Sequence, residues 1–90
     1  MKEFTFTIRD ANGIHARPAG LLVNCAKKFA SDVKARTAAK EVDGKRLLSM
    51  MSLGATQGTE ITFRVEGEDE ETACAALMEI CKEHLGYEGR

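Results

Sequence analysis

The stretch "EFTFTIRDANGIHARPAGLLVNCAKKF", residues 3–29, decides the fold because its hydrophobic period changes partway along. Residues 3–9 alternate apolar and polar side chains, which is typical of a strand with one buried face. The turn-forming residues "DANG" at 10–13 then interrupt this pattern. From 16 to 29 the apolar side chains recur at the spacing of an amphipathic helix: Ala19, Leu22, Val23, Ala26 and Phe29.

The remainder of the chain predicts five further elements. In order they are strands at 31–37 and 40–44, a short helix at 46–53, a strand at 59–67 and a helix at 68–86. Gly54 and Gly86 are expected to end the two helices. The order β-α-β-β-α-β-α, with short connections and one-sided strands, predicts an α+β fold in which helices cover one face of an antiparallel sheet.

Length and composition predict one domain, residues 1–90, with one core. The 90 residues are 43% hydrophobic and 30% charged, which excludes a catalytic cleft between two large domains. The chain has no run of about 18 apolar residues, and its N-terminus alternates, so neither a membrane span nor a signal peptide is expected. We therefore expect a cytoplasmic protein that is not inserted in a membrane.

The three cysteines are expected to be reduced. Cys74 and Cys81 lie seven positions apart on one predicted helix, too far along its axis for a disulfide. The sequence has no CxxC pair, so a metal or redox site is not expected. Buried thiols that pack as small apolar side chains are the favoured interpretation.

Charge is distributed unevenly along the chain. Residues 1–50 carry ten Lys or Arg against five Asp or Glu, whereas residues 51–90 carry three against nine. An acidic protein surface is therefore the expected partner of the first half. Nucleic acid is not expected, because no aromatic residues are interleaved with the basic ones.

His15 is a candidate phosphoryl acceptor. If the helix begins at Ala16, His15 is its N-cap, and its ring lies beside the unpaired N–H groups at the positive end of the helix dipole. A phosphoryl group on the ring could accept hydrogen bonds from the amides of Ala16 and Arg17, while the Arg17 guanidinium neutralises its oxygens. Imidazole is nucleophilic near neutral pH. The spacing alone also fits a histidine that merely caps the helix.

No cofactor is expected at this site. The sequence lacks the GxxxxGK[ST] loop and the clustered carboxylates that would bind MgATP, so ATP is not expected to be the direct phosphoryl donor.

The short helix is unusually apolar. A two-turn helix on a sheet buries one side, so some of the five apolar residues in this segment are expected to face a partner. All five could instead belong to the core. The set is Leu47, Leu48, Met50, Met51 and Leu53.

Three stretches together resemble one family. "GIHARPAG" (13–20), "GKRLLSMMSLG" (44–54) and "QGTEITFRVEGEDE" (57–70) are similar to the HPr family, the histidine-containing phosphocarriers of the bacterial phosphoenolpyruvate-dependent sugar phosphotransferase system. The resemblance runs over nearly the whole chain. It implies an open-faced β-sandwich of four antiparallel strands covered on one face by three helices.

The resemblance also implies roles for individual residues. His15 would be phosphorylated on Nδ1 by phospho-enzyme I and pass the group to a histidine of an enzyme IIA, with Arg17 assisting. The protein would be a monomeric carrier, not a catalyst. Its partner surface would comprise Gly20, Asn24, Lys27, Leu47, Leu48 and Met51.

The sequence departs from the family pattern in one place that matters. Many members from Gram-positive bacteria carry a regulatory serine just before the short helix, where this chain has Arg46. Ser49 and Ser52 lie inside the helix and do not match that site, so serine-based control is not expected.

Two other functions remain open on the sequence. One is a regulatory phosphoprotein of the nitrogen-branch type, and the other is a small phosphatase that hydrolyses its own phosphohistidine. His84, near the end of the last helix, carries no clear signal and is expected to be solvated surface.

Overall fold

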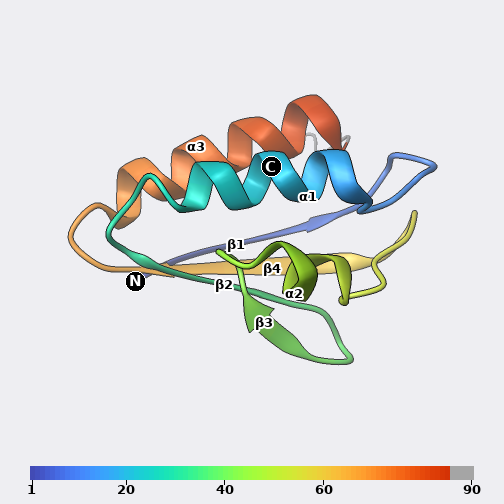
Figure 1. Ribbon diagram of the computed structural model, residues 1–90, viewed down its shortest axis with the longest axis horizontal. Coiled ribbons are helices and arrows are strands. Elements are labelled where there is room, and N and C mark those ends of the chain that lie inside the picture. The colour runs from blue at the N-terminus through green and yellow to red at the C-terminus, as the bar shows by residue number, and fades with distance from the viewer. Residues whose placement is uncertain (86–90) are drawn as a thin grey trace.

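The computed structural model describes residues 1–85. Figure 1 shows four strands and three helices in the predicted order. Their bounds are β1 Lys2–Thr7, α1 Ala16–Ala26, β2 Asp32–Arg36, β3 Glu41–Asp43, α2 Leu47–Met51, β4 Glu60–Glu66 and α3 Glu70–His84.

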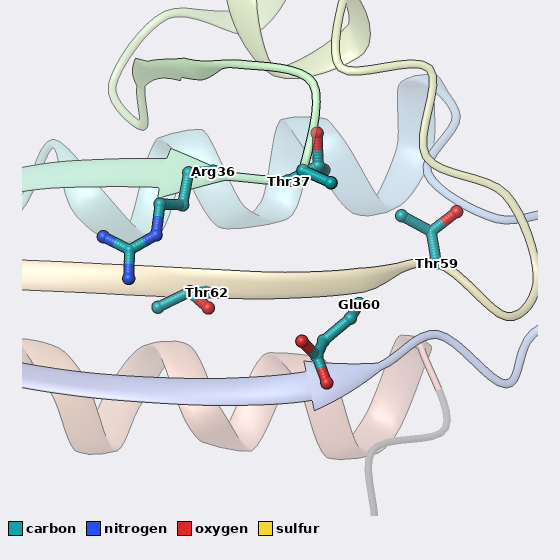
Figure 2. A pocket seen from close by; sticks show the side chains of 6 residues that line it. Arg36, Thr37, Thr59, Glu60 and Thr62 are labelled. Atoms are coloured by element: carbon teal, nitrogen blue, oxygen red, sulfur yellow. The ribbon is translucent and has the colours of Figure 1, made fainter.

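The strands form one antiparallel sheet in the order β1-β4-β2-β3. Helices α1 and α3 run side by side over one face (Figure 1), and α2 packs against α1. The other face is open and polar. There the Thr5 and Thr62 hydroxyls are hydrogen-bonded at 2.8 Å, and Arg36 lies 3.6 Å from Glu3. Figure 2 views this open face, with the helices behind the sheet. The predicted open-faced sandwich is confirmed.

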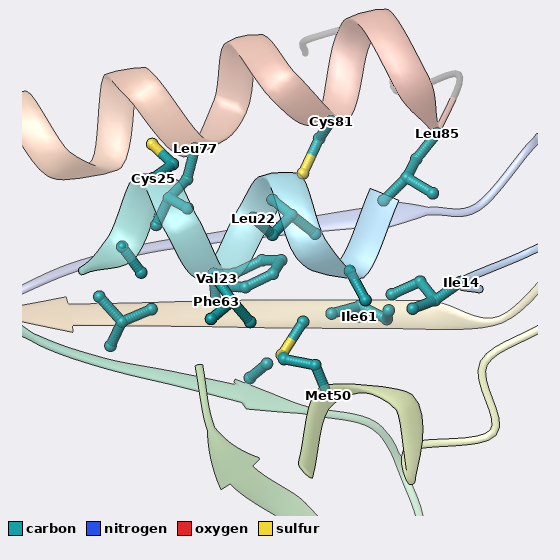
Figure 3. Close-up of a cluster of buried hydrophobic side chains, with 14 of the residues drawn as sticks. Ile14, Leu22, Val23, Cys25, Met50, Ile61, Phe63, Leu77, Cys81 and Leu85 are labelled. Atoms are coloured by element: carbon teal, nitrogen blue, oxygen red, sulfur yellow. The ribbon is translucent and has the colours of Figure 1, made fainter. Parts of the chain in front are cut away.

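The core lies between the sheet and the helices. Alternation along β4 buries Ile61, Phe63 and Val65 completely, and the Phe63 ring stacks on Phe4 at 5.3 Å between centroids. Figure 3 shows each helix contributing side chains to this layer, including Met50 from the short helix α2. Burying a large apolar side chain is worth about 1.5–3 kcal/mol, so this layer is the main stabilising feature of the fold.

Helix α1 is shorter than predicted. It ends at Ala26 and not at Phe29, which is half-buried in the turn that follows. The Asp69 carboxylate accepts backbone hydrogen bonds from Ala30 and Ser31, both at 2.9 Å. These bonds hold the chain in the turn after the helix. Because Asp69 is distant in the sequence, the local hydrophobic period does not predict where the helix ends.

The other predicted boundaries shift by a few residues. Strand β1 ends at Thr7, although Ile8 stays buried and bonds to the carbonyl of Thr59 at 2.9 Å. Helix α2 is capped by Ser52, so Gly54, with φ of 63°, follows the cap instead of forming it. The predicted helix stop at Gly86 lies outside the described residues.

All three cysteines are buried and free, which confirms the prediction. Burial raises the pKa of the thiols of Cys25, Cys74 and Cys81 above the usual value. They are therefore protonated at neutral pH and pack as small apolar groups.

Candidate functional site

A tight loop leads into the candidate site. Asp10 organises it, because its carboxylate accepts the N–H of Asn12 at 2.8 Å and its carbonyl accepts the N–H of Gly13 at 3.0 Å. The N–H of Ile14 then donates to the carbonyl of Ala55 at 3.0 Å. Gly13 has φ of +64°, and a Cβ there would lie 2.5 Å from the Ala55 oxygen. Only glycine fits at this position.

His15 is the N-cap of α1, as the sequence predicts. Its backbone is extended, with φ of −125° and ψ of −172°, and its carbonyl accepts the first helical hydrogen bond from Ala19 at 3.1 Å. Within residues 1–85 its side chain makes no capping hydrogen bond, and it is exposed. Pro18 has no N–H, so the amides of Ala16 and Arg17 are the free donors of the first turn.

His15 and Arg17 line one open pocket of about 310 Å³. Three segments form it: the loop before α1, the first turn of α1 and the last turn of α3. The described lining residues are Asp10, Asn12, His15, Arg17, Pro18, Glu83 and His84. The pocket therefore combines a nucleophilic ring, a guanidinium group and the positive end of a helix, which favour an anion, with the carboxylates of Asp10 and Glu83, which oppose one.

The remaining predicted residues of α1 lie outside this pocket. Gly20 is half-buried, and Asn24 and Lys27 are exposed. At about 1.5 Å per residue, Lys27 lies about 18 Å from His15 along the helix axis. None of the three is among the described residues that line the pocket.

Helix α2 divides its apolar residues between the core and the surface. Met50 is fully buried, whereas Leu48 is 81% exposed. Leu47 and Met51 are 41% and 39% exposed. The interpretation that all the apolar residues of this segment are core is therefore wrong.

Arg46 is exposed at the N-cap of α2. Its Nε lies 3.7 Å from a carboxylate oxygen of Asp43.

Sequence reasoning missed several residues of the site. Asn12 lines the pocket, although the sequence predicts only a turn at this position. Glu83 and His84 also line it, although the sequence gives no signal that either belongs to the site. Leu21, one helical turn after Arg17, is a further exposed apolar side chain. The turn-forming residues around Asn12 are the only sequence signal for any of these residues. Glu83 and His84 reach the pocket through the packing of α3 against the loop before α1, which the local sequence does not predict.

A second pocket, of about 490 Å³, lies on the open face of the sheet (Figure 2). Among the described residues it shares no lining side chain with the pocket at His15. Its lining residues are Arg36, Thr37, Ala38, Thr59, Glu60 and Thr62.

No group of three His, Cys, Asp or Glu side chains within residues 1–85 is placed to hold a metal ion. The helices of this part of the chain are also too short or too polar to cross a membrane.

Comparisons with known proteins agree on one family. The model of the PTS HPr component phosphorylation site matches residues 2–83. Phosphocarrier protein HPr of Lysinibacillus sphaericus is 46% identical over 83 residues, which cover 92% of this chain and 94% of that protein.

Solved structures agree with this assignment. The histidine-containing phosphocarrier protein of a Mycoplasma superposes with a TM-score of 0.93 at 31% identity, covering 98% of this chain and 100% of that chain. HPr of Thermoanaerobacter tengcongensis superposes with a TM-score of 0.88 at 40% identity, covering 99% and 100% of the two chains. The chain therefore belongs to the HPr family, the phosphocarrier proteins of the phosphotransferase system that serves sugar transport.

Proposed function

We propose that His15 accepts a phosphoryl group from phosphorylated enzyme I and passes it to a histidine of an enzyme IIA. The observation that carries this proposal is the position of His15: exposed at the N-cap of α1, in the same pocket as Arg17. A histidine that served only as a cap would bond its side chain to the first turn, and this one does not.

The transfer requires few protein groups. The Nδ1 lone pair of neutral His15 attacks the phosphorus of the donor phosphohistidine; a new P–N bond forms as the old one breaks, and its electron pair returns to the donor ring. Nδ1 is the ring nitrogen nearer the backbone, so a phosphoryl group on it lies close to the amides of Ala16 and Arg17. The Arg17 guanidinium neutralises the phosphoryl oxygens. Phosphoryl transfer depends mainly on such positioning and charge neutralisation.

The exposed apolar residues of α2 are the proposed docking surface for both partners. Leu48 is the most exposed of them, and apolar groups of this size contribute strongly once a partner removes them from water. Gly20, Asn24 and Lys27 extend this surface along α1. The basic surplus of residues 1–50 suits acidic partner surfaces. We place the protein, a carrier and not an enzyme, in the cytoplasm, where it meets both partners as a monomer.

We also propose that this protein lacks serine-based control at the start of α2, because Arg46 occupies the position concerned. Incubation with the kinase that phosphorylates HPr on serine, together with ATP, should give no phosphoserine. A phosphoserine in the intact protein would contradict this proposal.

A relay assay tests the main proposal. Phosphoenolpyruvate labelled on phosphorus is mixed with enzyme I, this protein and a panel of enzyme IIA proteins. Label should reach an enzyme IIA only when wild-type protein is present, and His15→Ala should block it. Label held stably on this protein but transferred to no enzyme IIA would favour the regulatory alternative. Rapid release of inorganic phosphate would favour the phosphatase.

A further inference from the structure

Backbone hydrogen bonds fasten the end of α3 to the loop that carries His15. The carbonyl of Leu85 accepts the N–H of Arg9 at 3.0 Å and the N–H of Asp10 at 3.3 Å. These bonds place the end of α3 beside the loop that precedes α1. The side chain of His84 therefore lines the pocket at His15 because of the fold itself.

The pocket is short of positive charge for an anion site. Among its described lining residues, Arg17 is the permanent cation, while Asp10 and Glu83 are carboxylates. A phosphoryl group on His15 would add further negative charge. Besides the His15 ring itself, the described lining group that can become positive is the imidazole of His84, whose side chain is 33% exposed.

We propose that His84 is a positioning residue of the phosphoryl pocket, pairing in its protonated form with the phosphoryl group on His15. This inference rests on the proposed function, because it requires a phosphoryl group on His15. Arg17 approaches that group from α1 and His84 approaches it from α3. Unlike arginine, an imidazole changes its charge between pH 5 and 8, so it can gain a proton when the anion arrives and lose it when the anion leaves.

The groups around His84 set the sign of the effect. Glu83 is the immediate partner, with its Oε2 3.7 Å from Nε2 of His84. Glu83 on α3, Asp10 on the loop and Arg17 on α1 are the other charged groups that line the pocket beside the His84 ring. The His15 ring is uncharged when it is ready to attack and becomes the carrier of negative charge after transfer. Phosphorylation therefore shifts the balance toward protonated His84.

The coupling works in both directions. If the phosphoryl group promotes protonation of His84, protonation of His84 favours phosphorylated His15 by the same factor. Because solvent in an open pocket weakens the attraction between the two groups, we expect a shift of only about 0.5 to 1 pH unit in the titration midpoint of His84 on phosphorylation, a three- to tenfold effect.

NMR titration of the His84 ring in the full chain tests this. Spectra are recorded from pH 5.5 to 8.5 with and without enzyme I and phosphoenolpyruvate, which regenerate the phosphorylated form throughout. The midpoint of His84 should be higher by the expected shift in the phosphorylated protein. An unchanged midpoint with His15 fully phosphorylated overturns the role of His84 and leaves the proposed function intact. Failure of His15 to take up phosphate overturns both.

Variants provide a second readout that a purely structural role would not change. The equilibrium of phosphoryl transfer from enzyme I is compared at pH 6 and pH 8. Relative to wild type, His84→Asn should lose about three- to tenfold of phosphorylated product at pH 6 and little at pH 8. His84→Lys carries a positive charge at both pH 6 and pH 8, so the amount of phosphorylated product should not fall below that of wild type at either pH. Lys82→Gln removes an exposed cation from the same turn outside the pocket and should match wild type. A wild-type profile for His84→Asn contradicts the proposal.

Discussion

At the scale of single residues, Gly13 sets the position of His15. It lies in the left-handed region, at φ of +64°, against the backbone of Ala55. The loop thereby turns the chain from the end of β1 into the first turn of α1, and His15 becomes an exposed cap. The chemistry of His15 thus depends on a residue that has no side chain.

Gly13→Ala should therefore lower stability. The strained φ and the clash with the Ala55 carbonyl predict a loss of about 1–3 kcal/mol in the free energy of unfolding, measured by urea denaturation. Gly20→Ala is the matched control, because a Cβ at Gly20 has no neighbour within 4 Å and the residue is helical. It should gain about 0.5–1 kcal/mol. Equal effects of the two substitutions would contradict the proposed role of Gly13.

The sequence predicts part of the site at this scale. Proline at the third helical position and the change of period place His15 at the cap and Arg17 in the first turn of the helix. Asn12 and His84 could not be assigned in the same way. Asn12 looks like any turn residue, and His84 reaches the pocket only because the Leu85 carbonyl binds the loop before α1.

At the scale of elements, α2 illustrates how a short helix serves two purposes. Met50 points from α2 into the core (Figure 3), whereas Leu48 faces solvent. The apolar composition alone shows that one side must be exposed. Which residues are exposed follows from how the helix packs on α1, so the sequence could not settle it.

Substitutions on the two sides of α2 should separate stability from docking. Leu48→Ser should change the free energy of unfolding by less than about 0.5 kcal/mol but raise the KM for phosphoryl transfer from enzyme I about tenfold. Met50→Ala should lower stability by about 2–5 kcal/mol, because it leaves a cavity. Urea denaturation measures the free energy of unfolding of each variant, and transfer kinetics measure its KM. An unchanged KM for Leu48→Ser would exclude Leu48 from the docking surface.

Asp69, the N-cap of α3, ties that helix to the turn after α1. Its carboxylate accepts hydrogen bonds from the hydroxyl and N–H of Ser31 and from the N–H of Ala30. The Ser31 hydroxyl, followed by the Ala30 amide, holds the pKa of Asp69 below its ordinary value of 3.8. Ionised Asp69 therefore stabilises the folded state.

The pH dependence of Asp69→Asn follows from that shift. A lowered pKa in the folded state means that the stabilisation is complete above the unfolded value of 3.8 and is lost as pH falls through the lower, folded value. The variant should be less stable than wild type at pH 7, and the difference should shrink below about pH 4. Thermal unfolding across pH measures this. Glu68→Gln, at the exposed neighbouring position, should show no such dependence; a constant gap for Asp69→Asn would contradict the assignment.

At the scale of the whole molecule, the sequence predicts element order and sheet type reliably because both arise from periodicity. Strands β1 and β4 alternate cleanly, and their pairing follows from burying one face. The boundaries are less predictable. Helix α1 ends where the carboxylate of Asp69, at the start of the neighbouring helix α3, accepts a hydrogen bond from the backbone of Ala30, and no local pattern encodes that contact.

The uneven charge predicts salt-sensitive association with enzyme I. Lys27→Gln, on α1, should raise the KM for phosphoryl transfer about twofold to threefold at low salt, and this difference should vanish as salt shortens the Debye length. Lys34→Gln, in β2 of the open-faced sheet, is the control and should have no effect. The measurement is the KM for phosphoryl transfer from enzyme I, determined for wild type and both variants at several ionic strengths. Equal effects of the two substitutions would show that net charge matters and docking geometry does not.

The most direct test of the central claim is the intact mass of the protein after incubation with enzyme I and phosphoenolpyruvate. Wild type should gain one phosphoryl group, about 80 Da, that is lost in acid, as expected for the labile P–N bond of a histidine on a phosphoryl relay. His15→Ala should gain nothing while remaining folded. A gain of one phosphoryl group in His15→Ala, or no gain in wild type, would contradict the assignment of His15 as the acceptor.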